Sequence, residues 1–186
     1  YEGVERSTVP VRDVLDLTSE KVKLTEESRS FVRDRLYQHF GTLRDAAAAL
    51  ELTEDFVYDS LWNRYVPLDR LDTVLDGIGA SRDDVEFDRV MLRHGESVAL
   101  PDVFDEDLMY LLGLVFGDGD IALGPRGGNR GLVRISNGDE ALLERAADIF
   151  AEKFDKHVDI EYQDDRVPCI RVHSATIARL FVNAGM

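Results

Sequence analysis

The stretch from Leu111 to Ile121 reads LLGLVFGDGDI, an apolar run that ends in two glycines and two acidic residues. The apolar residues predict a buried helix, and Asp118 then falls at its C-terminal end. Because the carbonyl groups there carry roughly half a negative charge, a carboxylate at this position is locally unfavourable. A divalent cation would offset that repulsion, since Mg²⁺ binds carboxylate oxygens, backbone carbonyls and water. Asp120 is either a second acid or a turn residue, and we favour the turn.

The two glycines of this helix are spaced so that they share one face. Gly113 and Gly117 lie four residues apart, which is about one helical turn. Without side chains there, another helix can approach at the short end of the usual spacing of about 8–10 Å. Two such helices would bring two Asp118 carboxylates side by side. This spacing therefore predicts a two-carboxylate metal site formed at an interface.

The nine residues LLGLVFGDG resemble the signature of the LAGLIDADG homing endonucleases. Val115 is a conservative replacement, Gly117 keeps a small residue, and Phe116 departs from the name-giving motif. The direct matches are Leu111, Gly113, Leu114, Asp118 and Gly119. The resemblance covers residues 107–186, rather less than half of the chain.

The resemblance implies a metal-dependent enzyme that cuts both strands of DNA at specific sites. Asp118 would be the catalytic acid that binds Mg²⁺ or Mn²⁺, with the Gly117 carbonyl beside it. Metal-activated water would then attack the phosphodiester. A four-stranded sheet would lie in the major groove, with DNA contacts from Arg126, Arg130, Arg134, Ser136, Arg166, Arg171 and His173. The family's catalytic basic residue has no clear match here.

A complete enzyme of this family needs two such motifs, and only one is present in the chain. The missing half is expected from a homodimer packed through Gly113 and Gly117, or from a second unit beyond Met186. The start at Tyr1 favours an excised piece. The resemblance points to the endonuclease region of a haloarchaeal intein, with a replication protein such as the minichromosome maintenance helicase as host. Residues for protein splicing are not seen at either end.

The elements that would position Asp118 form an α+β unit in the order αββαββα. Along the predicted strands, Val133 and Ile135 alternate with Arg134 and Ser136, giving one apolar and one polar face. A flat solvated face is the alternative interpretation of that pattern. The predicted helices are 108–117, 139–154 and 174–184, and the predicted strands are 119–124, 131–136, 157–162 and 167–173.

The rest of the chain divides by composition. We predict a lead-in segment at 1–25, a helical domain at 26–80, a connector at 81–105, and the single-motif unit at 106–186. Residues 42–65 fit a helix-turn-helix, although Glu51 stands where glycine is common. Asn63 and Arg64 would then contact DNA. A plain helical bundle is the equal alternative, because three acids would face the DNA.

Composition excludes several classes of protein. The single Cys169 rules out an internal disulfide and a cysteine-based zinc site, and favours a cytoplasmic setting. No apolar run approaches the roughly 18 residues of a membrane span, so no membrane partner is expected. The net charge is −15, and only four of the 22 basic residues are lysine. High acid and low lysine resemble proteins of salt-accumulating archaea.

Two other functions fit the sequence. One is a catalytically inactive DNA-binding relative, a regulator or a degenerate intein fragment within a DNA replication protein. The other is a helical interaction module fused to an unrelated α+β domain. The four histidines show no zinc-ligand spacing, so a histidine metal centre is not among the alternatives.

Overall fold

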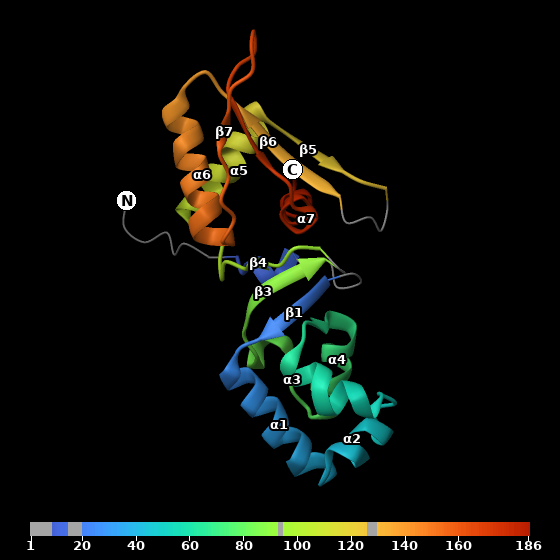
Figure 1. Ribbon diagram of the computed structural model, residues 1–186. Helices are drawn as coiled ribbons and strands as arrows, with labels where there is room; N and C mark the ends of the chain where they lie inside the picture. Colours follow the sequence, from blue (N-terminus) through green and yellow to red (C-terminus); the bar gives the residue numbers. More distant parts are fainter. Residues whose placement is uncertain (1–8, 15–19, 93–94, 126–129) are drawn as a thin grey trace, which may run out of the picture. The chain divides into compact units, whose positions relative to one another are not determined.

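The computed structural model describes residues 9–14, 20–92, 95–125 and 130–186 (Figure 1). The fold is α+β, as predicted, and contains two antiparallel sheets. The chain forms two compact units: Leu17–Ser97, here called the helical unit, and Tyr1–Asp16 with Val98–Met186, here called the sheet unit. Among the described helices none is long and apolar enough to span a bilayer.

The helices of the helical unit follow the local signals in the sequence. Thr25 caps the first helix by accepting from the Ser28 backbone N–H, and Gly41 ends it at a φ of +77°. Thr42 caps the second through Asp45. The elements are α1 (Glu26–Phe40), α2 (Leu43–Ala49), the π-helical η2 (Phe56–Ser60), α3 (Leu61–Asn63), α4 (Leu68–Gly77) and η3 (Arg82–Asp84). The expected helices within 26–80 are therefore confirmed.

Three strands complete this unit where the sequence suggested a lead-in segment and a connector. Strands β1 (Glu20–Leu24), β2 (Val66–Pro67) and β3 (Phe87–Leu92) lie in the order β2-β1-β3. In β1 only Val22 and Leu24 are apolar and buried, and charged residues stand between them. So short an alternation carries little signal, and its partner β3 lies some 70 residues away along the chain. The compact unit therefore crosses the boundaries predicted at residues 25 and 80.

The turn after α2 places a charged residue in an unfavourable backbone conformation. Glu51 has a φ of +53° and is exposed. A side chain in this left-handed region costs roughly 1–2 kcal/mol, because Cβ approaches the following carbonyl. The sequence had already marked Glu51 as occupying a glycine position.

Replacing Glu51 by glycine is therefore expected to raise the free energy of unfolding by about 0.5–1 kcal/mol, the relief of strain less the added entropy of the unfolded chain. Urea unfolding followed by Trp62 fluorescence measures this, because Trp62 is the single tryptophan of the sequence. Ala48→Gly, at an exposed position inside α2, is the matched control and should lose about 1 kcal/mol. Equal losses in both variants would show that the Glu51 side chain stabilises the turn.

The sheet unit has the predicted order αββαββα. Its core elements are α5 (Glu106–Asp118), β5 (Gly119–Leu123), β6 (Gly131–Ser136), α6 (Glu140–Phe154), β7 (Ile160–Glu161), β8 (Cys169–Val172) and α7 (Ala175–Asn183). Strand β7 is much shorter than the predicted 157–162. The short η1 (Val11–Val14) and β4 (Val98–Ala99) also belong to this unit. The expected β-like alternation near Val11 is instead a 3₁₀ turn.

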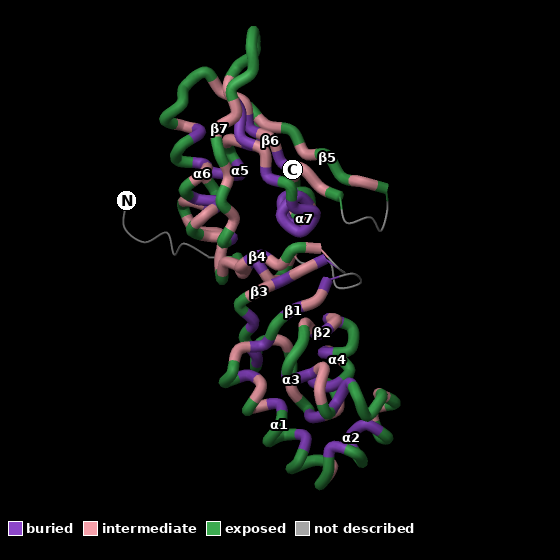
Figure 2. Tube along the Cα trace, in the orientation of Figure 1, coloured by how far each residue is buried: buried purple, intermediate pink, exposed green. Residues whose placement is uncertain are grey.

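The sheet runs in the order β5-β6-β8-β7, and its two faces differ as predicted. Val133, Ile135, Ile170 and Val172 are buried on the face that packs against α5, α6 and α7. Beneath it Phe150, Phe154 and Phe181 form a cluster with ring centroids 6.1 Å apart. Buried and half-exposed residues alternate along β6 (Figure 2). The second face is thus left open by the described helices.

An ion pair fixes the start of α5 against α6. Asp105 caps α5 by accepting from the Leu108 N–H at 3.0 Å, and its other oxygen accepts from Lys153 Nζ at 2.7 Å. The hydrogen bond from Lys153 is the main cause that lowers the pKa of Asp105, and the same bond raises the pKa of Lys153. With its first turn held in this way, α5 delivers its last residue, Asp118, to a defined place.

Candidate metal and nucleic-acid site

Asp118 is the last residue of α5, and the chain enters the edge strand β5 at the next position. Gly119 makes this abrupt change possible. A Cβ built on Gly119 would lie 2.7 Å from the Val115 Cα and 2.9 Å from the Arg134 carbonyl oxygen. These are backbone atoms and cannot move aside. Glycine at 119 therefore places the carboxylate at the margin of the sheet.

The carboxylate of Asp118 is exposed, and one oxygen accepts from Asn137 Nδ2 at 2.8 Å. The last carbonyl groups of a helix, here including that of Gly117, lack partners within the helix. Oxygen donors of this kind suit Mg²⁺. However, the described residues contain no group of three side chains that could hold a metal ion. One chain thus supplies a single carboxylate, which is half of the predicted two-carboxylate site.

The predicted interface residues Gly113 and Gly117 lie on an uncovered face of α5. No described atom comes within 4 Å of a Cβ built at either position. On the same face Phe116 is 80% exposed and Met109 is 55% exposed. Two large apolar side chains and two bare positions leave this face without a partner among the described parts of the chain.

The open face of the sheet carries a row of four charges. Arg134 of β6 stands directly opposite Arg171 of β8. Arg134 donates from Nε to Asp120 of β5 at 2.6 Å, and Arg171 donates to Glu161 of β7. Like charges directly opposite each other are unfavourable, and the two outer carboxylates offset that cost. Asp120 is therefore a strand residue and not the expected turn residue.

The remaining predicted contacts lie along the length of the sheet. Ser136 pairs in register with Cys169 near one end. Arg166 lies in the exposed turn between β7 and β8, and its backbone N–H donates to the Gln163 carbonyl. Next to this turn, the Tyr162 hydroxyl donates to Glu140 at 2.9 Å, and this bond is the main cause that raises the pKa of Tyr162.

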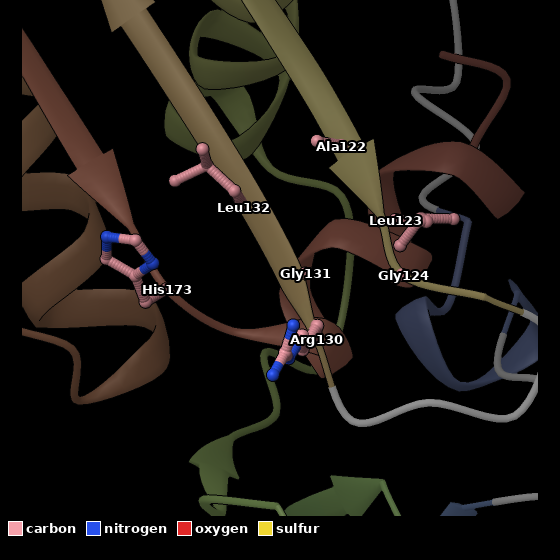
Figure 3. A pocket seen from close by; sticks show the side chains of 7 residues that line it. All are labelled: Ala122, Leu123, Gly124, Arg130, Gly131, Leu132 and His173. Atoms are coloured by element: carbon pink, nitrogen blue, oxygen red, sulfur yellow. The ribbon is translucent and has the colours of Figure 1, made fainter.

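At the other end of the open face there is a shallow hollow of about 520 Å³. Its lining residues are Ala122, Leu123, Gly124, Arg130, Gly131, Leu132 and His173. Figure 3 shows His173 at the end of β8, Leu132 on β6 and Arg130 just before β6. Two predicted DNA contacts, Arg130 and His173, are thus brought to one place, over a floor that is mainly apolar.

Three predicted contacts do not join this face. Arg126 lies outside the described residues. Asn63 and Arg64 belong to the helical unit, and both bind Asp59, at 2.9 and 2.7 Å respectively. They would have to leave Asp59 before contacting DNA. The helix-turn-helix interpretation stays a prediction.

Sequence reasoning missed the partners of the predicted residues. Asn137, Asp120 and Glu161 each bind a predicted site residue. Their positions depend on strand register, which pairs Asp120 with Arg134 across 14 residues. The only signal in the sequence was the opposite charge of residues on consecutive predicted strands.

No protein-family profile matches this sequence. A stretch of 98 residues is 34% identical to part of the A-type ATP synthase of Pyrococcus abyssi (strain GE5 / Orsay), within one subunit of that enzyme. The alignment covers 53% of this chain and 9% of that relative. The chain therefore spans a small part of the length of the protein it matches.

These comparisons contradict the family assignment made from the sequence. The relative belongs to an ATP synthase, and nothing in the comparisons supports a LAGLIDADG homing endonuclease, a haloarchaeal intein or a helicase host. The resemblance rested on nine residues. A closely packed helix that turns directly into a strand selects small residues and a terminal acid for its own structural reasons, as Gly119 illustrates.

Proposed function

We propose that the open face of the β5-β6-β8-β7 sheet binds double-stranded DNA, and that Asp118 supports metal-dependent hydrolysis of its phosphodiester bonds in a dimer. One observation carries the proposal. Helix α5 ends in an exposed carboxylate at the point where the chain enters the edge of a sheet whose uncovered face bears arginines. An acid that can hold a metal and a surface suited to DNA are therefore neighbours in the chain and in the fold.

The dimensions of the central strands suit the major groove. Strand β6 has six residues and is about 20 Å long at roughly 3.4 Å per residue. A major groove about 12 Å wide admits a two-stranded ribbon, which β6 and β8 would provide. Arg134 and Arg171 can donate to guanine, and Ser136 and His173 to several base edges. These side chains would read sequence, while Arg130 and Arg166 would contact phosphates at the two ends.

Asp120 and Glu161 have a supporting part in this proposal. In a chain with a net charge of −15, DNA binding depends on local positive charge and on salt. The two carboxylates hold their arginines in place, and each guanidinium keeps donors for a base because it carries five N–H groups. Such pairs favour selectivity over affinity.

The catalytic part needs a second copy of the chain. Asp118 gives one carboxylate, and the bare face of α5 around Gly113, Gly117, Phe116 and Met109 offers an apolar surface with two close-approach positions. Packing two copies through this face would cover the exposed apolar side chains and bring the two Asp118 residues together. A metal ion bound there would activate water and stabilise charge on the phosphate oxygens. The residues themselves hold the metal and set the distance to the DNA.

Fluorescence anisotropy of a labelled duplex over a range of KCl concentrations tests the DNA-binding part. We expect the logarithm of the binding constant to fall linearly with the logarithm of the salt concentration, with a slope of about 0.9 per phosphate contact. The double variant Arg134→Gln, Arg171→Gln should weaken binding about 10-fold or more. Arg44→Gln, an exposed arginine of the helical unit, should change nothing. Absence of binding at low salt would overturn the proposal.

A second candidate is DNA binding without cleavage. It is favoured by the lack of a three-residue metal cluster in the described residues and by the hydrogen bond that already engages Asp118 with Asn137. The two candidates share the DNA-binding surface and differ only in metal-dependent cleavage, so a cleavage assay separates them.

A further inference from the structure

The helical unit contains a second pocket, formed by residues of that unit alone. Its volume is about 230 Å³, and it is lined by Glu26, Arg29, Ser30, Arg33, Trp62 and Asn63. The first four residues have the spacing of one face of a helix, here α1. The pocket therefore lies between that face of α1 and the end of α3.

Two arginines of this pocket are held without a carboxylate. Arg29 donates to the carbonyl oxygens of Thr25, at 3.3 Å, and of Trp62, at 2.8 Å. The Arg33 guanidinium lies 4.7 Å from the centre of the Trp62 ring. Neither forms an ion pair in the part of the chain that the structure describes. Other arginines there do bind carboxylates, namely Arg44, Arg64, Arg82, Arg134, Arg145 and Arg171.

This arrangement is unusual for a protein with 37 acidic and 22 basic residues. A surplus of carboxylates makes an unneutralised pair of guanidinium groups on one helix face costly to leave idle, because like charges one turn apart repel each other. Stacking on Trp62 occupies the flat face of Arg33 and leaves its N–H edge directed elsewhere. Asn63 and the Ser30 hydroxyl add polar groups that can donate or accept hydrogen bonds.

We propose that this pocket binds a phosphate group. Guanidinium groups match phosphate geometry and donate two hydrogen bonds at once, and the volume is below the roughly 300 Å³ of pockets for larger ligands. The phosphate could belong to a nucleic-acid backbone or to a free phosphate compound, since both present the same oxygens. The proposal goes beyond DNA binding by the sheet, because it concerns a different unit and different residues.

Glu26 gives the proposal a sharp signature. Its carboxylate is exposed at the pocket lining and would repel an anion bound to Arg29 and Arg33. Replacement by glutamine should therefore strengthen phosphate binding, whereas loss of an arginine should weaken it. A purely structural role of these residues would not produce opposite changes in affinity.

Trp62 supplies the readout. It is the single tryptophan, it is buried, and its indole N–H donates to the Val57 carbonyl at 2.7 Å, so the ring has a fixed position beside the pocket. Titrating the full chain with inorganic phosphate should give a saturable change in Trp62 fluorescence that sodium chloride at equal ionic strength does not. Arg33→Gln should reduce the affinity about 10-fold or more, Glu26→Gln should increase it, and Arg44→Gln should leave it unchanged.

Arg33 is the better variant because it is exposed, whereas Arg29 also bonds the Trp62 carbonyl and contributes to the fold. A short DNA duplex added to the same assay distinguishes the sources. Competition with inorganic phosphate identifies a backbone phosphate as the ligand, and phosphate binding without competition identifies a free phosphate compound. If phosphate produces no saturable change, or if Arg33→Gln binds it as tightly as the natural chain, the inference is wrong. Neither result depends on whether the sheet binds DNA.

Discussion

Replacing Asp118 by asparagine is expected to lower Mg²⁺-dependent cleavage of duplex DNA by about 100-fold or more, the usual size of the loss when a group that stabilises a transition state is removed. Asparagine keeps the shape of the side chain and an oxygen for the Asn137 N–H, which donates to Asp118 at 2.8 Å. It removes the negative charge that a divalent cation needs. DNA binding, which uses the arginine face of the sheet, should be nearly unchanged.

The measurement is cleavage of a plasmid or duplex library with and without Mg²⁺, together with anisotropy for binding and sedimentation for assembly. Asp148→Asn, an exposed acid of α6, is the matched control and should cut normally. Gly113→Leu should prevent dimer formation and cleavage while the monomer stays folded, because no described atom lies within 4 Å of a Cβ at that position. Binding of DNA by the natural chain without any metal-dependent cleavage would favour the inactive candidate.

Replacing Gly131 by alanine is expected to lower the free energy of unfolding of the sheet unit by about 3 kcal/mol, at the upper end of the usual cost of overpacking. A Cβ there would lie 2.5 Å from the Ala175 Cα and 3.0 Å from the Ala175 nitrogen. These are backbone atoms at the start of α7, so relief requires α7 to move away from β6. The cluster of Phe150, Phe154 and Phe181 would then lose packing with α7.

Urea unfolding followed by far-ultraviolet circular dichroism measures this change, and Trp62 fluorescence reports the helical unit separately. Gly113→Ala is the control: it has open space inside α5 and should gain up to about 1 kcal/mol from helix propensity. A loss below roughly 1 kcal/mol in Gly131→Ala would mean that α7 adjusts easily and that its contact with β6 is loose.

Local signals made most helices predictable. In α4, the predicted apolar face of Leu68, Leu71, Val74 and Leu75 is buried, and Pro67 stands just before the helix. Caps and glycines placed the limits of α1 and α6 almost to the residue. Strands β1 and β3 were missed because each gains its identity from the other. Val22 pairs with Val90, and no pattern within either short segment reveals a partner that far along the chain.

The candidate site divides in the same way. Alternation along β6 and β8 predicted which side chains leave the core, because it depends only on neighbouring residues. The pairing of Asp120 with Arg134 depends on register and was not predicted. The family assignment failed for a related reason, since a nine-residue pattern records how one helix packs and ends but not what the assembled surface does.

The pairing of β1 with β3 has a consequence for how the chain is assembled. Glu20 pairs with Leu92, so the helical unit begins and ends at adjacent positions. The sheet unit is likewise closed across the interruption, because the Val11 N–H donates to the Asp102 carbonyl at 3.0 Å and Pro10 bridges Val103. The helical unit is thus an insertion whose two ends meet, in a host whose own cut ends also meet. Such a module can be gained, lost or exchanged in evolution without pulling the surrounding fold apart.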